Sequence, residues 1–297
     1  MASPANVVAG KVLSVILRKR PSILGLFLVL RGSVIQVIWK QLLLVMAVAL
    51  AVVWAHGALP QVVVALDFAP FGLIGIALSV FLSFRNGACY DRWWEARKLW
   101  GLMIQTARDM VRQTIVLEDT PERRQILMAL VQFGHRAAKQ LRGQPPADSA
   151  DAALIEAGRS VSRLERDGRL TGTEALVLHE SLARMAGALL GCERLAHTPV
   201  PFAYTLLLHR TAYLFCIMLP FGFVDELGWA TPLAAGLVAY AFFGLDALAD
   251  ELEMPFSHNQ NAMPLTTYAT AMEIALRGAL GDSDLPELPK PVNYLLT

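Results

Sequence analysis

Apolar and charged residues fall into long separate blocks along this chain. Four stretches, residues 34–56, 68–84, 205–224 and 229–248, are apolar almost throughout. A helix needs about 20 mostly apolar residues to cross a hydrocarbon core. The pattern therefore predicts four membrane-spanning helices, which we number spans one to four in chain order.

A polar block over residues 85–203 separates spans two and three. Its periodicity is helical, with one helix predicted to start at Pro121 and another to run over 150–166. Thr171 and Glu174 have the spacing of a capping box for the last helix of the block. The block therefore predicts a helical bundle in water.

Span two passes directly into this block. The apolar run PFGLIGIALSVFLSF is followed at once by RNGACYDRWWEARKLWG, and together they cover residues 70–101. We expect one helix to pass from the membrane into water over this stretch.

In the second half of the chain, too, apolar spans are followed by acidic residues. Pro220 is predicted to break span three, and residues 225–228 to form a tight acidic loop. The acids Asp250, Glu251 and Glu253 are expected to follow span four, ahead of an amphipathic helix near 266–280 and an extended, proline-containing tail.

Basic residues are also unevenly distributed. No Lys or Arg occurs over residues 41–84 or 211–276, and only 17% of all residues are charged. Basic loops remain on the cytoplasmic side of a membrane. This places the N-terminal segment 1–33, the polar block and the C-terminal segment 250–297 in the cytoplasm, with both termini. Nucleic acid is not an expected partner, because such binders carry a basic face without apolar spans.

The sequence contains no pattern of catalytic or metal-ligating residues. Cys89, Cys192 and Cys216 are widely spaced without a CxxC pair, and the histidines have no HExxH spacing. Neither a Ser-His-Asp elbow nor a glycine-rich phosphate loop occurs. We therefore expect no catalytic residue, no bound metal and no cofactor.

Span two carries the candidate site. Ile76, Val80 and Phe84 are spaced i, i+4 and i+8, so they follow one side of a helix. In several copies around an axis they would form stacked apolar rings, which narrow a pore and gate it by dewetting. The spacing alone favours the plainer interpretation, in which these residues face lipid or pack against another helix.

The charged stretch after span two is interpreted as structural. Trp93 and Trp94 would lie at headgroup level, with the neighbouring charges forming pairs. Asp246, within span four, is expected to pair with a basic residue such as Arg85 or Arg210, because an unpaired acid inside a membrane is costly.

Three blocks of the sequence stand out as motifs. They are Phe84-Arg85-Asn86 with Tyr90-Asp91-Arg92-Trp93-Trp94-Glu95-Ala96-Arg97 and Leu99-Trp100-Gly101; Pro199, Pro201-Phe202-Ala203-Tyr204, His209-Arg210 and Pro220-Phe221-Gly222; and Glu251-Leu252-Glu253 with Pro255-Phe256. In these blocks, which follow one another in the same order as in the family, the sequence resembles the bestrophins, and the likeness covers almost the whole chain. The shorter bacterial members are the most similar.

The resemblance implies an all-α fold. Its four transmembrane helices would continue into a cytosolic helical bundle and assemble as a homopentamer around a central pore. The expected location is the bacterial inner membrane, and the expected partners are other copies of the chain, membrane lipids and permeant monovalent ions.

The same resemblance assigns roles to individual residues. Ile76, Val80 and Phe84 become the neck of the pore. A lower constriction would be formed by Leu189, Leu190 or Leu195. An interface or structural role falls to the signature residues Arg85, Asn86, Asp91, Arg92, Trp93, Trp94 and Glu95.

The chain departs from animal bestrophins at one point. Residues 257–265 contain no carboxylate, whereas the animal members carry acids there that help bind calcium. Calcium favours oxygen cages with charged ligands, so we expect no calcium gating.

Apolar rings carry no charge, so they do not indicate whether the permeant ion is a cation or an anion. Animal members are mainly anion channels and a bacterial relative is treated as passing monovalent cations, so the bacterial branch implies sodium, with chloride as the alternative. A non-conducting membrane scaffold that recruits a cytosolic partner is a second alternative.

Overall fold

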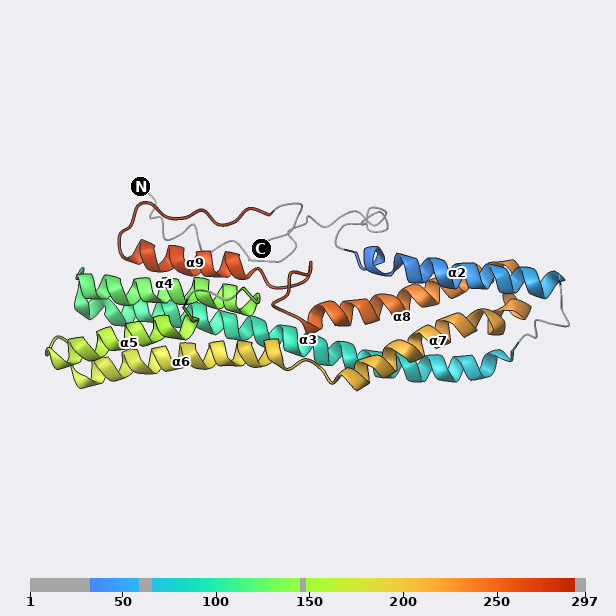
Figure 1. The fold of residues 1–297 in the computed structure, drawn as a ribbon, viewed down its shortest axis with the longest axis horizontal. Helices are drawn as coiled ribbons and strands as arrows, with labels where there is room; N and C mark the ends of the chain where they lie inside the picture. Colours follow the sequence, from blue (N-terminus) through green and yellow to red (C-terminus); the bar gives the residue numbers. More distant parts are fainter. Residues whose placement is uncertain (1–32, 59–65, 145–147, 292–297) are drawn as a thin grey trace. The chain divides into compact units, whose positions relative to one another are not determined.

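The computed structural model describes residues 33–58, 66–144 and 148–291, and every regular element in these ranges is helical (Figure 1). The predicted basic segment 1–33 and most of the loop 57–67 lie outside the described residues. The elements are α2 (Ile35–Ala58), α3 (Phe68–Gln113), η2 (Thr114–Leu117), α4 (Pro121–Leu141), α5 (Ala150–Arg166), α6 (Gly172–His197), α7 (Phe202–Leu227), η3 (Gly228–Ala230), α8 (Thr231–Glu253) and α9 (Leu265–Ala279).

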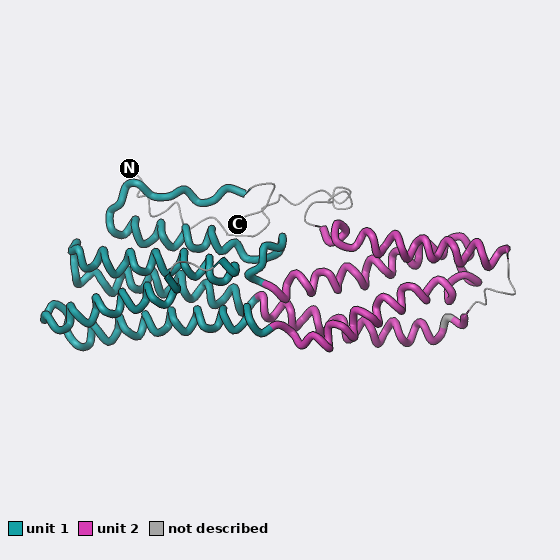
Figure 2. Tube along the Cα trace, viewed as in Figure 1, with its two compact units in different colours: residues 1–19, 94–198, 255–297 teal, residues 20–93, 199–254 magenta. Residues whose placement is uncertain are grey.

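The chain divides into two compact units, which Figure 2 colours separately. Unit 2, residues 20–93 and 199–254, contains α2, the first part of α3, α7 and α8. Helix α2 packs against α7 and α8, around a core of apolar side chains that includes Ile38, Phe215 and Phe243. The outward side chains of unit 2 are apolar too, among them Leu43, Leu233 and Leu237. Helices that are apolar on all sides are typical of membrane spans.

Unit 2 therefore carries the four predicted spans. Length and hydropathy select α2, the start of α3, and the stretch 202–253, which contains both α7 and α8. Helix α6 passes the same criteria, but it belongs to unit 1 and packs against α4 and α5. We assign the spans to α2, the start of α3, α7 and α8, and the protein is an integral membrane protein.

Unit 1 has the pattern of a water-soluble bundle. Its described part holds the remainder of α3 together with α4, α5, α6 and α9. Helix α4 packs against α5 and α9, and α5 packs against α6. Ile126, Phe133 and Val161 are buried in these contacts, whereas Arg159 and Glu165 lie on the exposed side of α5. Such one-sided burial is typical of helices that border water.

Several sequence predictions are confirmed to the residue. Helix α3 is one helix of 46 residues that crosses the seam between apolar and charged sequence. Pro121 is the first residue of α4, and α5 spans Ala150–Arg166. Thr171 and Glu174 form a reciprocal capping box at the start of α6.

Three predictions about spans three and four are wrong. Helix α7 runs through Pro220 without a break, because neighbouring helices in a membrane can support the backbone groups that a proline leaves unpaired. Asp225 and Glu226 therefore lie in α7 and not in a loop. Helix α8 extends to Glu253, so residues 250–253 are helical rather than following the helix.

Two carboxylates of unit 1 hold α9 to its surroundings. Glu273 accepts hydrogen bonds from His135 at 2.7 Å and from Arg277 at 3.0 Å. Asp282 accepts from Arg124 at 2.8 Å and from Arg277 at 3.0 Å. Burial alone would raise the pKa of Glu273, but these two hydrogen bonds bring it below its ordinary value. Arg124 and Arg277 likewise lower the pKa of Asp282.

The lowered pKa of Glu273 predicts acid sensitivity. A carboxyl with a lowered folded-state pKa stabilises the fold above its unfolded pKa and loses this contribution as the pH falls through the folded value. For Glu273 the ordinary value is 4.5. We expect Glu273→Gln to lower the melting temperature in detergent at neutral pH, with the difference from the unchanged protein disappearing at pH values well below 4.5.

The matched control is Glu156→Gln, an exposed side chain on α5. It should leave the melting temperature unchanged over the same pH range. Equal effects of the two substitutions at neutral pH would show that the Glu273 contacts do not stabilise unit 1.

Candidate functional site

Within unit 2, helix α3 has two distinct faces. Phe71, Leu78, Leu82, Arg85 and Cys89 are buried against the rest of the unit. At about 100° per residue, these positions cluster on one side of the helix.

The predicted stripe lies on the opposite side, about 180° around the helix axis. Ile76 is 67% exposed, Val80 47% and Phe84 66%. The structure therefore turns all three side chains away from the described part of their own subunit, towards lipid, another copy or a pore.

Close contacts with α7 fix the rotation of α3. A Cβ on Gly75 would come within 3.1 Å of the Phe215 ring. In the reverse direction, a Cβ on Gly222 of α7 would come within 2.8 Å of the Phe71 ring. Glycine at both positions lets the two helices approach closely, as small residues do in membranes.

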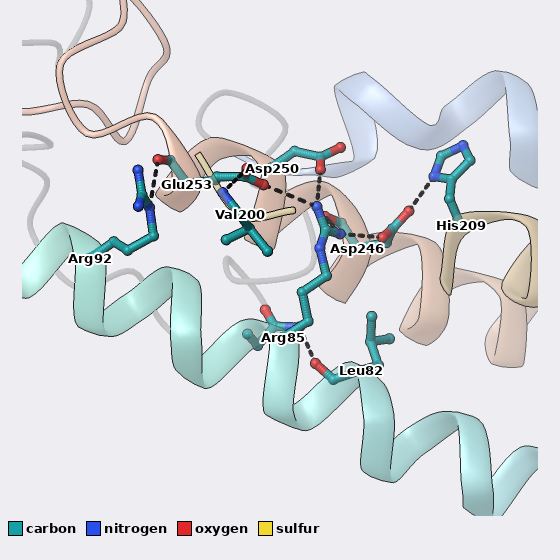
Figure 3. A network of polar contacts seen from close by, with 9 residues as sticks. Leu82, Arg85, Arg92, Val200, His209, Asp246, Asp250 and Glu253 are labelled. Carbon is teal, nitrogen blue, oxygen red and sulfur yellow. Dashed lines mark hydrogen bonds and ion pairs between the residues drawn. The ribbon is translucent and has the colours of Figure 1, made fainter. Parts of the chain in front are cut away.

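Arg85, the residue after Phe84, is buried among three carboxylates of α8 (Figure 3). Its Nη1 lies 2.5 Å from Asp246 Oδ1, and its Nη2 pairs with Asp250 and lies 3.5 Å from Glu253. The second oxygen of Asp246 lies 2.6 Å from His209 Nδ1 of α7. One guanidinium thus ties α3 to α8 and, through Asp246, to α7.

Further hydrogen bonds hold Glu253, the last residue of α8. Glu253 Oε1 accepts from the backbone N–H of Val200 at 3.0 Å, and its carbonyl oxygen accepts from Arg92 Nε at 3.4 Å (Figure 3). Buried charges need such additional partners, because desolvation otherwise exceeds the Coulomb attraction.

The predicted partner of Asp246 is confirmed as Arg85. Arg210, the other candidate, is exposed. The contributions of Asp250, Glu253 and His209 were not predicted. Residues 246, 250 and 253 have the i, i+4, i+7 spacing of one helix face, and this signal was obscured by the assumption that span four ends near residue 248.

The remaining signature residues do not form one site. The Asn86 amide donates to the carbonyl oxygen of Leu82 at 2.9 Å, one turn back, so Asn86 does not interrupt the helix. Asp91 is exposed. The Trp93 ring stacks with that of Tyr90, their centroids 6.5 Å apart.

The two signature residues that belong to unit 1 lie at its surface. The Trp94 side chain is 45% exposed. Glu95 pairs with Arg194 of α6 at 2.6 Å. The structural role that the sequence predicts for these two residues stays a prediction.

The three leucines proposed for a lower constriction differ in burial. Leu189 is 4% exposed and Leu195 5%, so both pack inside unit 1. Leu190 is 67% exposed on the outer face of α6. Of the three, only Leu190 has a side chain available to line a path.

No cluster of three or more metal-binding side chains occurs among the described residues. At residues 257–265, Arg142 donates to the carbonyl oxygens of Ser257 and Met263. A guanidinium at these oxygens opposes a second cation, and the absence of calcium gating stays a prediction.

Comparison with known proteins matches this architecture. The family model described as Bacterial/Fungal Bestrophin protein matches residues 15–278. The "Voltage-dependent anion channel-forming protein mll4386" of Mesorhizobium japonicum is 41% identical over 301 residues, covering 95% of this chain and 97% of that protein. The "Voltage-dependent anion channel-forming protein YneE" of Escherichia coli is 36% identical over 275 residues, covering 86% and 90%.

A solved structure shows the same fold. The crystal structure of a bacterial bestrophin homolog from Klebsiella pneumoniae superposes with a TM-score of 0.78 at 36% identity, covering 82% of this chain and 99% of that one. The four spans and these matches define the class as an integral membrane protein related to channel formers, not to enzymes. The chain belongs to the bestrophin family, in its bacterial and fungal branch.

The Arg85 cluster predicts a large loss of stability on substitution. Arg85→Met leaves three carboxylates without their shared cation, and breaking a buried pair costs about 3–5 kcal/mol. We expect a markedly lower melting temperature in detergent. Adding Asp246→Asn to Arg85→Met should recover part of the loss, because it removes the buried negative charge that Arg85 had balanced.

Arg210→Met provides the control, since Arg210 is adjacent to the cluster residue His209 but exposed. It should change the melting temperature little. A comparable loss in both single variants, or no recovery in the double variant, would contradict the stabilising role of the cluster.

Proposed function

We propose that this protein is an ion channel in which several copies of α3 surround the path of the ions. The observation that carries the proposal is the exposed apolar stripe of Ile76, Val80 and Phe84, on the face of α3 opposite its packing contacts. In a ring of copies these side chains form the neck, three stacked apolar constrictions. Such constrictions gate by excluding water.

The proposed assembly is a homopentamer, in accordance with the bestrophin family. A single α3 cannot enclose a path, so the site is complete only between copies. In unit 1 we propose Leu190 as the lower constriction, because Leu189 and Leu195 are buried. We place the channel in the bacterial inner membrane with both termini in the cytoplasm, on the strength of the basic polar block.

We propose that small monovalent anions such as chloride permeate. The support comes from relatives named as voltage-dependent anion channel-forming proteins at 41% and 36% identity. The sodium preference expected from the bacterial branch receives no support from these names. The neck itself carries no charge, so the preference depends on charged groups at its ends.

Asp91 is the charged residue that follows the neck on the same face of α3. It is exposed, lies two turns beyond Phe84, and forms no ion pair with any described residue. Rings of acidic side chains attract cations and repel anions. We therefore propose that Asp91 limits the preference of the pore for anions.

Widening the neck tests the path. The triple variant Ile76→Ala, Val80→Ala, Phe84→Ala should raise single-channel conductance severalfold in planar bilayers. The smaller alanine side chains leave a wider neck, and a wider apolar neck fills with water more readily. The matched control replaces Leu43, Leu233 and Leu237 with Ala, which are equally exposed apolar residues of unit 2.

The control should conduct like the unchanged protein. If neither the unchanged protein nor the neck variant conducts, the channel proposal fails and the scaffold alternative is favoured. If both triple variants conduct equally, ions do not pass along the stripe.

The reversal potential in a NaCl gradient tests the permeant ion. We expect a value near the chloride equilibrium potential, and a further shift towards it in Asp91→Asn, while Glu226→Gln, an exposed acid on α7, should cause no shift. A value near the sodium potential would overturn the anion proposal and leave the channel itself intact.

A further inference from the structure

Unit 1 contains a small cavity that the channel function does not use. Its volume is about 240 Å³, and it lies between the end of α4 and the segment that leads into α9. The described residues that line it are His135, Ala138, Lys139, Arg142, Gln144, His258 and Thr266.

The lining is basic and lacks a counter-ion. Lys139 and Arg142 carry permanent positive charge, and no carboxylate stands among the described lining residues. The nearby acid Glu273 is already bonded to His135 at 2.7 Å and to Arg277 at 3.0 Å. Its negative charge is therefore already balanced by the Arg277 guanidinium.

Arg142 is held in place by neutral groups only. It donates to the carbonyl oxygen of Met263 at 2.9 Å and to that of Ser257, and its Nη1 lies 3.2 Å from His258 Nδ1. Burial lowers the pKa of the Arg142 guanidinium, and no carboxylate offsets this cost. The guanidinium is thus oriented at the cavity wall but not neutralised.

Lys139 adds a second positive charge one helical turn before Arg142. Its side chain is exposed and makes no hydrogen bond or ion pair with the described residues. Like charges at this spacing repel each other by a few tenths of a kcal/mol. The C-terminal end of α4 favours cations, by about 0.3–1 kcal/mol, but it does not replace a counter-ion.

We propose that this cavity binds a small phosphate-bearing anion, either free phosphate or a phosphate monoester. The ammonium of Lys139 and the guanidinium of Arg142 supply charge-assisted hydrogen bonds, the strongest kind that a phosphate oxygen can accept. The Gln144 amide and the Thr266 hydroxyl line the same space and add neutral donors. The volume accommodates a phosphate group with a small substituent. The site lies within unit 1 alone, so it does not depend on the proposed channel.

Calorimetric titration of the full-length protein in detergent tests the site. One arm uses inorganic phosphate and the other glycerol 3-phosphate, both at constant, near-physiological chloride so that unspecific attraction is screened. We expect saturable binding of at least one probe. Tighter binding of inorganic phosphate would identify free phosphate as the ligand, and tighter binding of glycerol 3-phosphate would identify a phosphate monoester.

Lys139→Met should weaken this binding about tenfold or more, because it removes a charged hydrogen bond. The side chain is exposed, so the fold should survive, and an unchanged melting temperature will verify this. Lys98→Met, another exposed lysine of unit 1 that lies outside the cavity lining, should bind like the unchanged protein.

Three results would overturn the proposal. These are no saturable binding in either arm, equal binding by the Lys139 and Lys98 variants, and displacement of the probe by chloride alone.

Discussion

One buried guanidinium fixes the rotation of α3 about its own axis within unit 2. Arg85 reaches three carboxylates on a single face of α8, and Asp246 extends the contact to His209 of α7 (Figure 3). Because the charge is buried, any rotation of α3 would leave it or its acids unpaired, at a cost of several kcal/mol. The residue before it, Phe84, is therefore held on the exposed face of α3, together with Val80 and Ile76.

The two faces of α3 carry different kinds of contact. The inner face of α3 carries glycine contacts and the ion cluster, which fix its position against α7 and α8. The outer face carries the apolar side chains of Ile76, Val80 and Phe84, with the exposed Ser79 and Ser83 beside them. In the proposed channel such a neck needs no charged group to narrow the path, and we propose that the charge of the ion is selected at its ends, where Asp91 lies on the same face of α3.

The sequence predicts the helices well, because long apolar runs, Pro121 and the Thr171–Glu174 pair are strong local signals. It does not predict which leucine of α6 faces outward, since Leu189 and Leu190 are adjacent and only the packing of unit 1 distinguishes them.

Other features depend on contacts between distant residues. Asp250 and Glu253 are not predicted as partners of Arg85, because the apolar run ends near residue 248 and gives no sign that α8 continues to Glu253 with both acids on the face of Asp246. The basic cavity was missed for the same reason, because Lys139 and Thr266 meet only in the folded unit. Local periodicity carries no information about such pairs.

The central claim is that ions pass along the exposed stripe of α3, and thiol accessibility tests it most directly. The native residues Cys89, Cys192 and Cys216 are buried, so a single new cysteine can be modified selectively. A charged methanethiosulfonate reagent applied to the Val80→Cys variant during bilayer recording should abolish or strongly reduce the current. Leu233→Cys, exposed on α8, should conduct unchanged. Persistent full current through Val80→Cys, with the thiol shown by mass spectrometry to be modified, would contradict the account.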